Sequence, residues 1–216
     1  LYDMGGRAGG GIPGLPWTRG GSSGGFDFAQ PASQGVFAKL NQQALSETLA
    51  SIDASIKDPK MKAEMKAAVE KMSKEMGGLP TGMKVEIGMA KGFQGYEWHG
   101  KVQGKTITLN KKIYGGSYDK AEGRKLLSIK AGISTSTKKP AIQTFVHEFG
   151  HKYYDRLSAG GKMKVEQVFS HFSTSKSTKG WGSYAKKSAS EFYADAVAKS
   201  VLGGSDKWTK ALGKIK

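Results

Sequence analysis

Apolar residues recur at helical spacing in two segments near the beginning of the chain. In residues 36–56 they stand three or four positions apart, which predicts an amphipathic helix. A second helix is predicted from Pro59 to just before Gly77, because proline favours the first position of a helix and glycine ends one. This second segment carries a stripe of methionines, which is more typical of a packed core than of a binding surface. The apolar positions of the first segment are Val36, Phe37, Leu40, Leu45, Leu49, Ile52 and Ile56.

The pattern changes between Met83 and Tyr114. Residues 83–87 and 105–110 alternate between apolar and polar side chains, and residues 96–99 lie between them. Glycines punctuate these stretches, as expected where a chain turns sharply. The segment therefore predicts a small sheet of about three short strands joined by hairpin turns.

The second half of the chain predicts three more helices, at about residues 140–157, 162–172 and 188–202. The first of them carries apolar side chains on all sides, so we expect it to be buried in the centre of the fold. Together with the sheet, these segments predict an α+β domain over residues 36–216. In this domain two helices come first, a small sheet follows, and a buried helix leads into a helical C-terminal part.

Residues 1–35 form a separate, glycine-rich arm. They contain 11 of the 31 glycines, and aromatic residues that include Trp17, Phe26 and Phe28 are interspersed among them. Such a segment cannot build a core of its own. We expect the arm either to lie against a protein partner through its aromatic residues or to link the domain to an upstream one.

Composition narrows the chemistry that the chain can carry. There is no cysteine, so disulfides are excluded and a metal site must draw on the 4 histidines and 18 acidic residues. No apolar stretch reaches the length of a membrane span, and residues 1–6 lack the pattern of a secretory signal.

The formal net charge of +16 is large for 216 residues. Such a charge attracts polyanions, of which DNA is one candidate, and the expected binding is non-specific and weakened by salt. The lysines and arginines are spread along the chain without a recognisable nucleic-acid-binding motif. A general nucleic-acid binder is therefore a hypothesis that depends on charge alone.

Residues 147–151 read His-Glu-Phe-Gly-His, an H-E-x-x-H motif within the predicted buried helix. Because they are four positions apart, His147 and His151 project from one face of the helix and can reach one metal ion. Glu148 lies beside them, where it can accept a proton from water held by that ion. Burying these polar side chains without partners would be costly, and a zinc ion, Zn²⁺, removes that cost.

A catalytic zinc site needs a third protein ligand and one open position. Leu157 stands where a longer form of the motif has a histidine ligand, so that form is excluded. The candidates for the third ligand are Glu191 in the last predicted helix and His171. We favour Glu191, although its spacing from Ser188 also fits a capping box that needs no metal. Asp195 lies one turn after Glu191 and can orient a ligating histidine.

The H-E-x-x-H motif and the later acidic helix resemble the gluzincin group of zinc peptidases. Within that group the chain is most similar to the catalytic domain of anthrax lethal factor and to the bacterial Pro-Pro endopeptidases. Those proteins carry H-E-F-G-H, a glutamate ligand some 40 residues later, and a tyrosine seven residues before that glutamate. Here Glu191 follows His151 by 191 − 151 = 40 residues, and Tyr184 precedes Glu191 by 191 − 184 = 7 residues.

The resemblance covers about residues 83–202. It implies a zincin-like metallopeptidase fold with His147, His151 and Glu191 as zinc ligands. It also implies that Glu148 is the general base, and that Tyr184 donates to the oxyanion that forms during hydrolysis.

Three further residues have weaker assignments. Asp195 matches the acidic position of the gluzincins only loosely. Asp155, four positions after His151, is either a second carboxylate that orients a ligand or a solvated charge at the end of its helix. His99 is expected to be structural or to lie at the edge of a substrate site.

Two functions compete. The leading hypothesis is a zinc-dependent endopeptidase that hydrolyses a peptide or protein substrate held along the edge of the small sheet. The alternative is a minor head protein of a bacteriophage virion, in which a zincin-like domain contacts DNA or other virion proteins. The arm and the positive charge fit that alternative, whereas the complete set of predicted site residues favours catalysis. Location stays open between a secreted effector and a virion-associated protein.

Overall fold

The computed structural model describes residues 31–80, 82–89, 99–204 and 206–213, with side chains from residue 35 onward. The aromatic residues of the predicted arm, Trp17, Phe26 and Phe28, lie outside the described residues. The elements follow one another as α1 (Pro31–Ser55), α2 (Pro59–Glu75), β1 (Lys84–Gly88), β2 (Gly100–Gln103), β3 (Thr106–Asn110), α3 (Lys111–Tyr114), α4 (Tyr118–Lys130), the 3₁₀ turn η2 (Pro140–Ile142), α5 (Gln143–Arg156), α6 (Ala159–Thr174), the 3₁₀ turn η3 (Ser183–Lys186), α7 (Ala189–Val201) and α8 (Lys207–Leu212).

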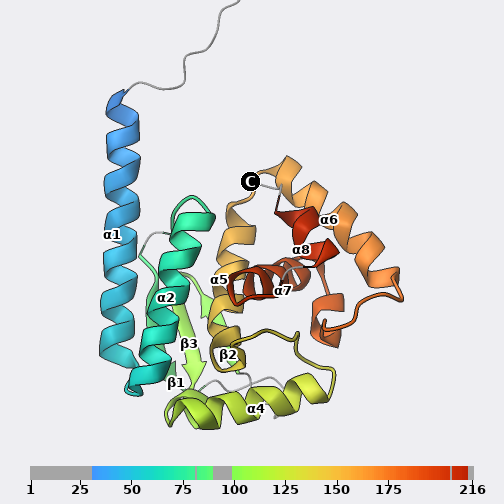
Figure 1. Cartoon of the computed structure of the whole chain (residues 1–216). Coiled ribbons are helices and arrows are strands. Elements are labelled where there is room, and N and C mark those ends of the chain that lie inside the picture. Colours follow the sequence, from blue (N-terminus) through green and yellow to red (C-terminus); the bar gives the residue numbers. More distant parts are fainter. Residues whose placement is uncertain (1–30, 81, 90–98, 205, 214–216) are drawn as a thin grey trace, which may run out of the picture.

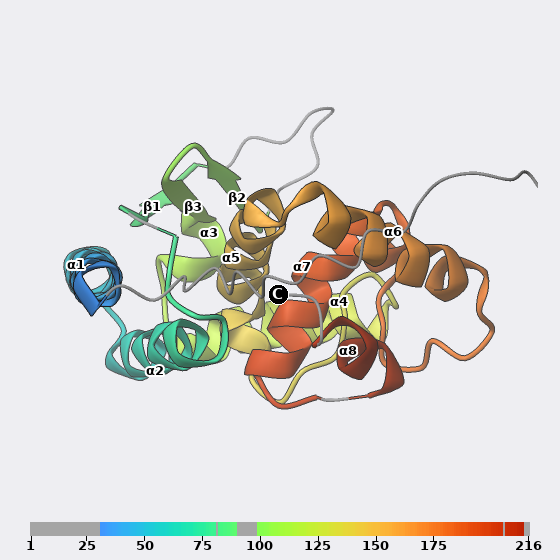
Figure 2. The same cartoon turned by 90° about the horizontal axis from the view of Figure 1, so that it is seen from above.

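This arrangement confirms the predicted α+β class, with a small sheet in a mostly helical fold. Helices α1 and α2 lie at one end of the molecule and α6 and α8 at the other, with α5 and α7 crossing between them (Figures 1 and 2). One continuous core of buried side chains extends from α1 to α8.

Helix α1 begins earlier and packs less than its pattern predicts. Its start at Pro31 places residues 31–35 in the helix, where the sequence predicted the end of the arm. The apolar side chains of its first half are exposed, with Phe37 at 67% and Leu40 at 45%, whereas Ile52 in its second half is completely buried. The reason is geometric, because the N-terminal end of α1 projects past the other elements that the structure describes (Figure 1).

Helix α2 has the predicted bounds and the predicted core face. Asp58 caps it by accepting a hydrogen bond from the Met61 backbone N–H at 2.8 Å, and Pro59 occupies the first turn. The methionine stripe is buried, which confirms its role in the core; Met61, Met65 and Met72 are each 0% exposed.

The sheet has three strands in the order β1-β3-β2. The predicted hairpin exists between β2 and β3, where Gly104 turns the chain with a φ of 57°. Strands β1 and β3 are instead parallel, so no hairpin joins them. The second strand, β2, lies at 100–103; of the predicted strand at 96–99, residues 96–98 lie outside the described residues.

The two edge strands have different neighbours. Along β1, the hydroxyls of Ser51 and Ser55 in α1 donate to the Val85 carbonyl at 3.1 and 2.6 Å, and Ser51 accepts from the Val85 N–H at 2.8 Å. Helix α1 thus satisfies backbone groups on that edge. Strand β2 lies against α5, the helix that carries the H-E-x-x-H motif.

The three helices predicted for the second half are present as α5, α6 and α7, and three more α-helices occur beside them. The pattern did not predict α3, α4 and α8, which are short or have few buried side chains. Helix α6 starts at Ala159, so Gly160 and Gly161 begin a helix and do not end the preceding one; Ser158 caps it by accepting from the Gly161 N–H at 3.1 Å. Helix α5 is central and buried as predicted, with every residue from 143 to 150 below the surface.

Candidate metal centre

A glycine lets the two helices of the site approach each other. Gly150 of α5 faces Ala194 of α7 so closely that a Cβ added at position 150 would lie 2.5 Å from Ala194 Cα and 2.9 Å from its carbonyl oxygen. Any larger residue at this position of the motif would push the helices apart. The close approach carries Glu191, one turn earlier on α7, toward the histidines of α5.

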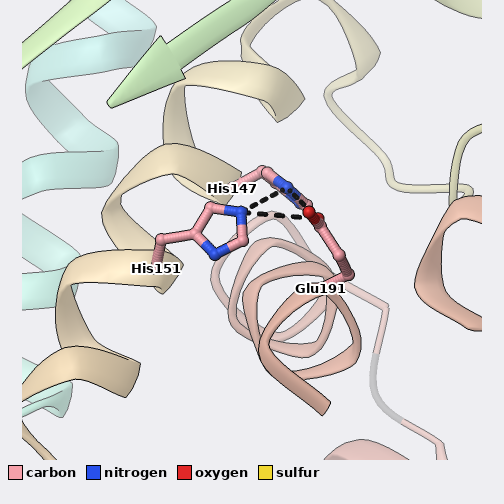
Figure 3. Close-up of side chains that lie close together, drawn as sticks. All are labelled: His147, His151 and Glu191. Carbon is pink, nitrogen blue, oxygen red and sulfur yellow. Dashed lines mark hydrogen bonds and ion pairs between the residues drawn. The ribbon is translucent and has the colours of Figure 1, made fainter. Parts of the chain in front are cut away.

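Three side chains converge where α5 and α7 meet (Figure 3). The distance from His147 Nε2 to His151 Nε2 is 3.1 Å, and Glu191 Oε2 lies 3.0 Å from the first and 3.4 Å from the second. These residues form a group that could hold a metal ion, and they are the three that the sequence predicted as ligands. His171 lies exposed on α6 and does not belong to this group.

The spacing of these atoms fits a small cation with short bonds. A four-coordinate zinc ion with bonds of about 2.0–2.1 Å would hold neighbouring ligand atoms about 3.3 Å apart. The three observed separations lie around that value. In addition, Glu191 Oε2 is buried and accepts no hydrogen bond of good geometry from the described residues. Three electron-pair donors thus face one another at a position that a cation can satisfy.

Asp195 orients the first histidine. Its Oδ1 lies 2.7 Å from His147 Nδ1, and because a carboxylate can only accept, Nδ1 carries the proton and Nε2 is left for a metal. Its other oxygen, Oδ2, accepts from the Thr135 hydroxyl at 2.6 Å. Thr135 Oγ1 accepts in turn from the Gly182 backbone N–H at 3.0 Å. A chain of hydrogen bonds therefore fixes the ring of His147 from two loops.

The second histidine and the glutamate are held by serines at the start of α7. Ser190 Oγ lies 2.9 Å from His151 Nδ1, which again leaves Nε2 toward the centre. Ser188 caps α7 by accepting from the Glu191 backbone N–H at 3.2 Å. The capping interpretation and the ligand interpretation of this segment are therefore compatible, since the cap uses the backbone of Glu191 and its side chain turns to the histidines.

The site strongly favours positive charge. Burial opposes the charged form of His147, but Asp195 and Glu191 outweigh it and raise the pKa of this imidazole to about 10. Burial likewise opposes the charged form of Glu191, and the two imidazoles outweigh it and lower the pKa of this carboxyl to about 2. Without a metal, the additional proton on His147 reduces the repulsion among the lone pairs that converge here. A divalent cation can reduce this repulsion for all three ligands.

Glu148 is buried next to this group. Its side chain interacts electrostatically with His147, His151 and Glu191, and its pKa is raised mainly because burial disfavours the carboxylate. The backbone of Val102 in β2 interacts with the carboxylate and lowers its pKa in part. Glu148 therefore lies between the histidine pair and the edge strand of the sheet.

Tyr184 borders the site next to His147. Its ring centroid is 6.2 Å from that of His147, and its phenol interacts with Glu191. Burial first, and then the nearby carboxylates, raise its pKa to about 12, so the phenol keeps its proton. The backbone holds it in place, because the Tyr184 N–H donates to the Ile133 carbonyl at 3.2 Å and a Cβ on Gly182 would collide with that same carbonyl.

Asp155 does not join the site. It is exposed at the end of α5 and pairs with Lys152 at 3.1 Å. Of the two interpretations left by the sequence, this placement matches the solvated helix-end charge and not a carboxylate that orients a ligand. His99 lies half-buried at the start of β2, and its carbonyl accepts from the Asn110 N–H at 3.0 Å.

Sequence reasoning missed three residues around the site. Ser190 contacts the predicted ligand His151, and Thr135 bonds to Asp195, which orients His147. Lys125 of α4 is buried and interacts electrostatically with Glu148 and Asp195. Thr135 and Ser190 occur in polar stretches whose composition is ordinary for loops and helix ends. The one available signal was the position of Ser190 directly before Glu191.

Comparison with protein-family models, with curated proteins and with solved structures finds no match. Within the residues that the structure describes, no helix is long and apolar enough to cross a membrane. The interpretation of the site therefore depends on its own geometry and chemistry.

Proposed function

We propose that this chain is a zinc-dependent endopeptidase of the gluzincin type, with a zincin-like fold. The observation that carries the proposal is a buried glutamate, Glu148, next to a converging group of two imidazoles and a carboxylate. Zinc is the metal that this donor set suits best, since two histidines and one glutamate form a common catalytic zinc site and the chain has no cysteine.

When bound, zinc would act as a Lewis acid that polarises a peptide carbonyl and lowers the pKa of a water molecule. Glu148 supplies the proton transfer. Its raised pKa brings it closer to neutral pH, where a carboxylate can accept a proton from the attacking water and pass it to the leaving amine. His147, His151 and Glu191 hold the metal, and Asp195 keeps His147 in the required tautomer.

Tyr184 supports the oxyanion that develops on the scissile carbonyl. Its phenol keeps its proton at neutral pH and lies close to Glu191, so it can donate a hydrogen bond as negative charge develops. The loop contacts of Gly182 and Ile133 hold it rigidly, as a preorganised donor requires.

An extended peptide or protein segment is the substrate that the surroundings fit. Among the described strands, β2 is an edge of the sheet, and the backbone of its residue Val102 reaches Glu148. A segment that pairs with this edge would therefore pass the reacting groups. Binding of DNA or another polyanion stays a separate prediction from the net charge of +16.

Cleavage of a broad peptide library by the zinc-loaded protein tests the proposal. Glu148→Gln keeps the shape of the side chain but cannot accept a proton, so it should reduce the rate by about 10²- to 10⁴-fold without loss of zinc. Tyr184→Phe should reduce kcat less, with little change in KM. Glu166→Gln, at an exposed position of α6, is the matched control and should leave the rate unchanged.

Two results would contradict the proposal in different ways. A Glu148→Gln variant that cleaves as fast as the wild type would exclude Glu148 as the base. A wild type that binds zinc and cleaves nothing across the library would favour the structural, virion-associated alternative.

A further inference from the structure

Behind Glu148, helix α4 places a lysine in the interior. Lys125 is 8% exposed, and its ammonium group donates a hydrogen bond to Thr144 Oγ1 at 3.1 Å. Thr144 lies one turn before Glu148 on α5, and its hydroxyl also interacts with the buried phenol of Tyr114. A buried ammonium group is costly unless nearby charge compensates for it, so its presence here calls for a physical reason.

A second buried lysine shows what ordinary compensation looks like in this chain. Lys199 of α7 is 7% exposed, and its Nζ lies 3.8 Å from a carboxylate oxygen of Asp206 and 3.5 Å from the carbonyl oxygens of Ser136 and Gly180. A neighbouring carboxylate therefore balances its charge. By contrast, the ammonium group of Lys125 donates its hydrogen bond to a neutral hydroxyl, that of Thr144.

The charges that face Lys125 belong to the metal centre. Burial lowers its pKa to about 8, and Asp195 and Glu148 act in the opposite direction. At neutral pH the side chain is therefore mostly protonated. The two carboxylates interact electrostatically with it and belong to two different helices, Asp195 to α7 and Glu148 to α5, whereas Lys125 belongs to a third, α4.

The positive charge of Lys125 balances the formal charges of the metal-loaded site. Glu148, Glu191 and Asp195 contribute −3, and a divalent cation held by neutral histidines contributes +2. The remainder is −1, and the ammonium group of Lys125 brings the sum to −3 + 2 + 1 = 0. An uncompensated charge would be costly at this depth, because low-polarity surroundings screen it poorly.

We propose that Lys125 is the counter-charge of the metal centre, an inference that rests on the proposed zinc site. Its ammonium group neutralises the loaded site and limits the affinity of the site for the cation. The ammonium group repels a bound cation and stabilises the carboxylates when the cation is absent. Both effects make zinc binding weaker with Lys125 than without it.

The test is the zinc dissociation constant, measured by competition with a chelator at about pH 7. Lys125→Met keeps the length of the side chain but removes its charge, and it should bind zinc about 3- to 10-fold more tightly than the wild type. Lys125→Gln can still bond to Thr144, and it should show the same gain, because the charge and not the hydrogen bond is responsible. Lys199→Met is the matched control, and its zinc affinity should equal that of the wild type.

Several results would overturn this proposal. One is a folded Lys125→Met protein whose zinc affinity is equal to or weaker than that of the wild type; should this variant fail to fold, the same criterion applies to Lys125→Gln. Another is an equal gain for Lys199→Met, which would point to net charge in general. Since no peptide is involved, expected zinc affinities in a protein that cleaves nothing would refute only the peptidase, whereas a wild type that binds no zinc would overturn both.

Discussion

Helices α5 and α1 differ in which side chains they bury. Helix α5 buries polar residues, including Gln143, His147 and Glu148, in the centre of the molecule. Helix α1 exposes apolar residues, with Phe37 at 67% and Leu40 at 45%. Both sets of residues depart from the usual distribution, in which apolar side chains lie inside and polar ones outside.

The buried polar side chains of α5 and the exposed apolar side chains of α1 differ in the contacts that they make. The histidines of α5 have precise neighbours, with Asp195 at 2.7 Å from one and Ser190 at 2.9 Å from the other. The exposed apolar side chains belong to the end of α1 that extends beyond the other described elements (Figure 1). Buried polar groups that are oriented by several elements indicate a site, whereas exposed apolar groups alone indicate only a surface.

The largest effect should come from separating α5 and α7. Gly150→Ala places a methyl group against the backbone of Ala194, and the overpacking should destabilise the fold by about 1–3 kcal/mol and weaken zinc binding as Glu191 moves away. Gly123→Ala is the matched control, since its helical position in α4 has open space around it. There the same substitution should stabilise the protein by about 0.5–1 kcal/mol. Chemical denaturation and zinc titration of both variants check this; equal effects at the two positions would refute the steric explanation.

The same helix pair shows how far sequence reasoning reached. The spacing of His147 and His151 on one helix is local, so the pattern could predict that face and its burial. Glu191 was favoured mainly by a resemblance to gluzincins, which places the third ligand 40 residues after the second histidine. The chain of Thr135, Asp195 and His147 depends on how a loop packs against two helices, and no local pattern encodes that contact.

The rest of the fold shows the same limit. The start of α1 at Pro31 and the exposure of Phe37 depend on where neighbouring elements end. The alternation of apolar and polar residues predicts strands but does not determine that β1 pairs with β3 in parallel, since this pairing depends on the tertiary structure. Lys125 was missed because a single lysine in an amphipathic segment is normally solvated.

A smaller effect is expected from the carboxylate that orients His147. Asp195→Asn should preserve the fold and lower zinc affinity by about 10- to 100-fold, because the amide no longer fixes the tautomer of the imidazole. Asp155→Asn is the control, since this exposed carboxylate pairs with Lys152 outside the site. Zinc competition titrations with both variants check the prediction. A loss of affinity for Asp155→Asn would restore Asp155 as a residue that supports the site.

The pH dependence of zinc binding should be milder still. The pKa of His147 is raised to about 10, so in the metal-free protein this ring is protonated at pH 7 and must release that proton when zinc binds. The pKa of Glu191 is lowered to about 2, so this ligand contributes no proton. Zinc affinity should therefore rise about tenfold per pH unit between about pH 7 and 9. Calorimetry in buffers of different ionisation enthalpy measures the released proton directly.

The sign of the accompanying stability change follows from the same shift. A histidine whose pKa is raised from 6.5 to about 10 stabilises the metal-free fold fully below pH 6.5, and this contribution is lost as pH rises toward 10. The gain in melting temperature on adding zinc should accordingly increase with pH. A gain that is constant or falls over this range would contradict the assignment of the proton to His147.

The smallest effect is expected at the projecting end of α1. Phe37→Ala removes a side chain that is 67% exposed, so the free energy of unfolding should change by no more than about 0.5 kcal/mol. Ile52→Ala, at a completely buried position of the same helix, should cost about 2–5 kcal/mol because it leaves a cavity. Denaturant unfolding of the two variants compares them directly. A cost for Phe37→Ala near that of Ile52→Ala would mean that the first half of α1 is covered in solution, and the loss of that cost on dilution would identify the cover as a second molecule.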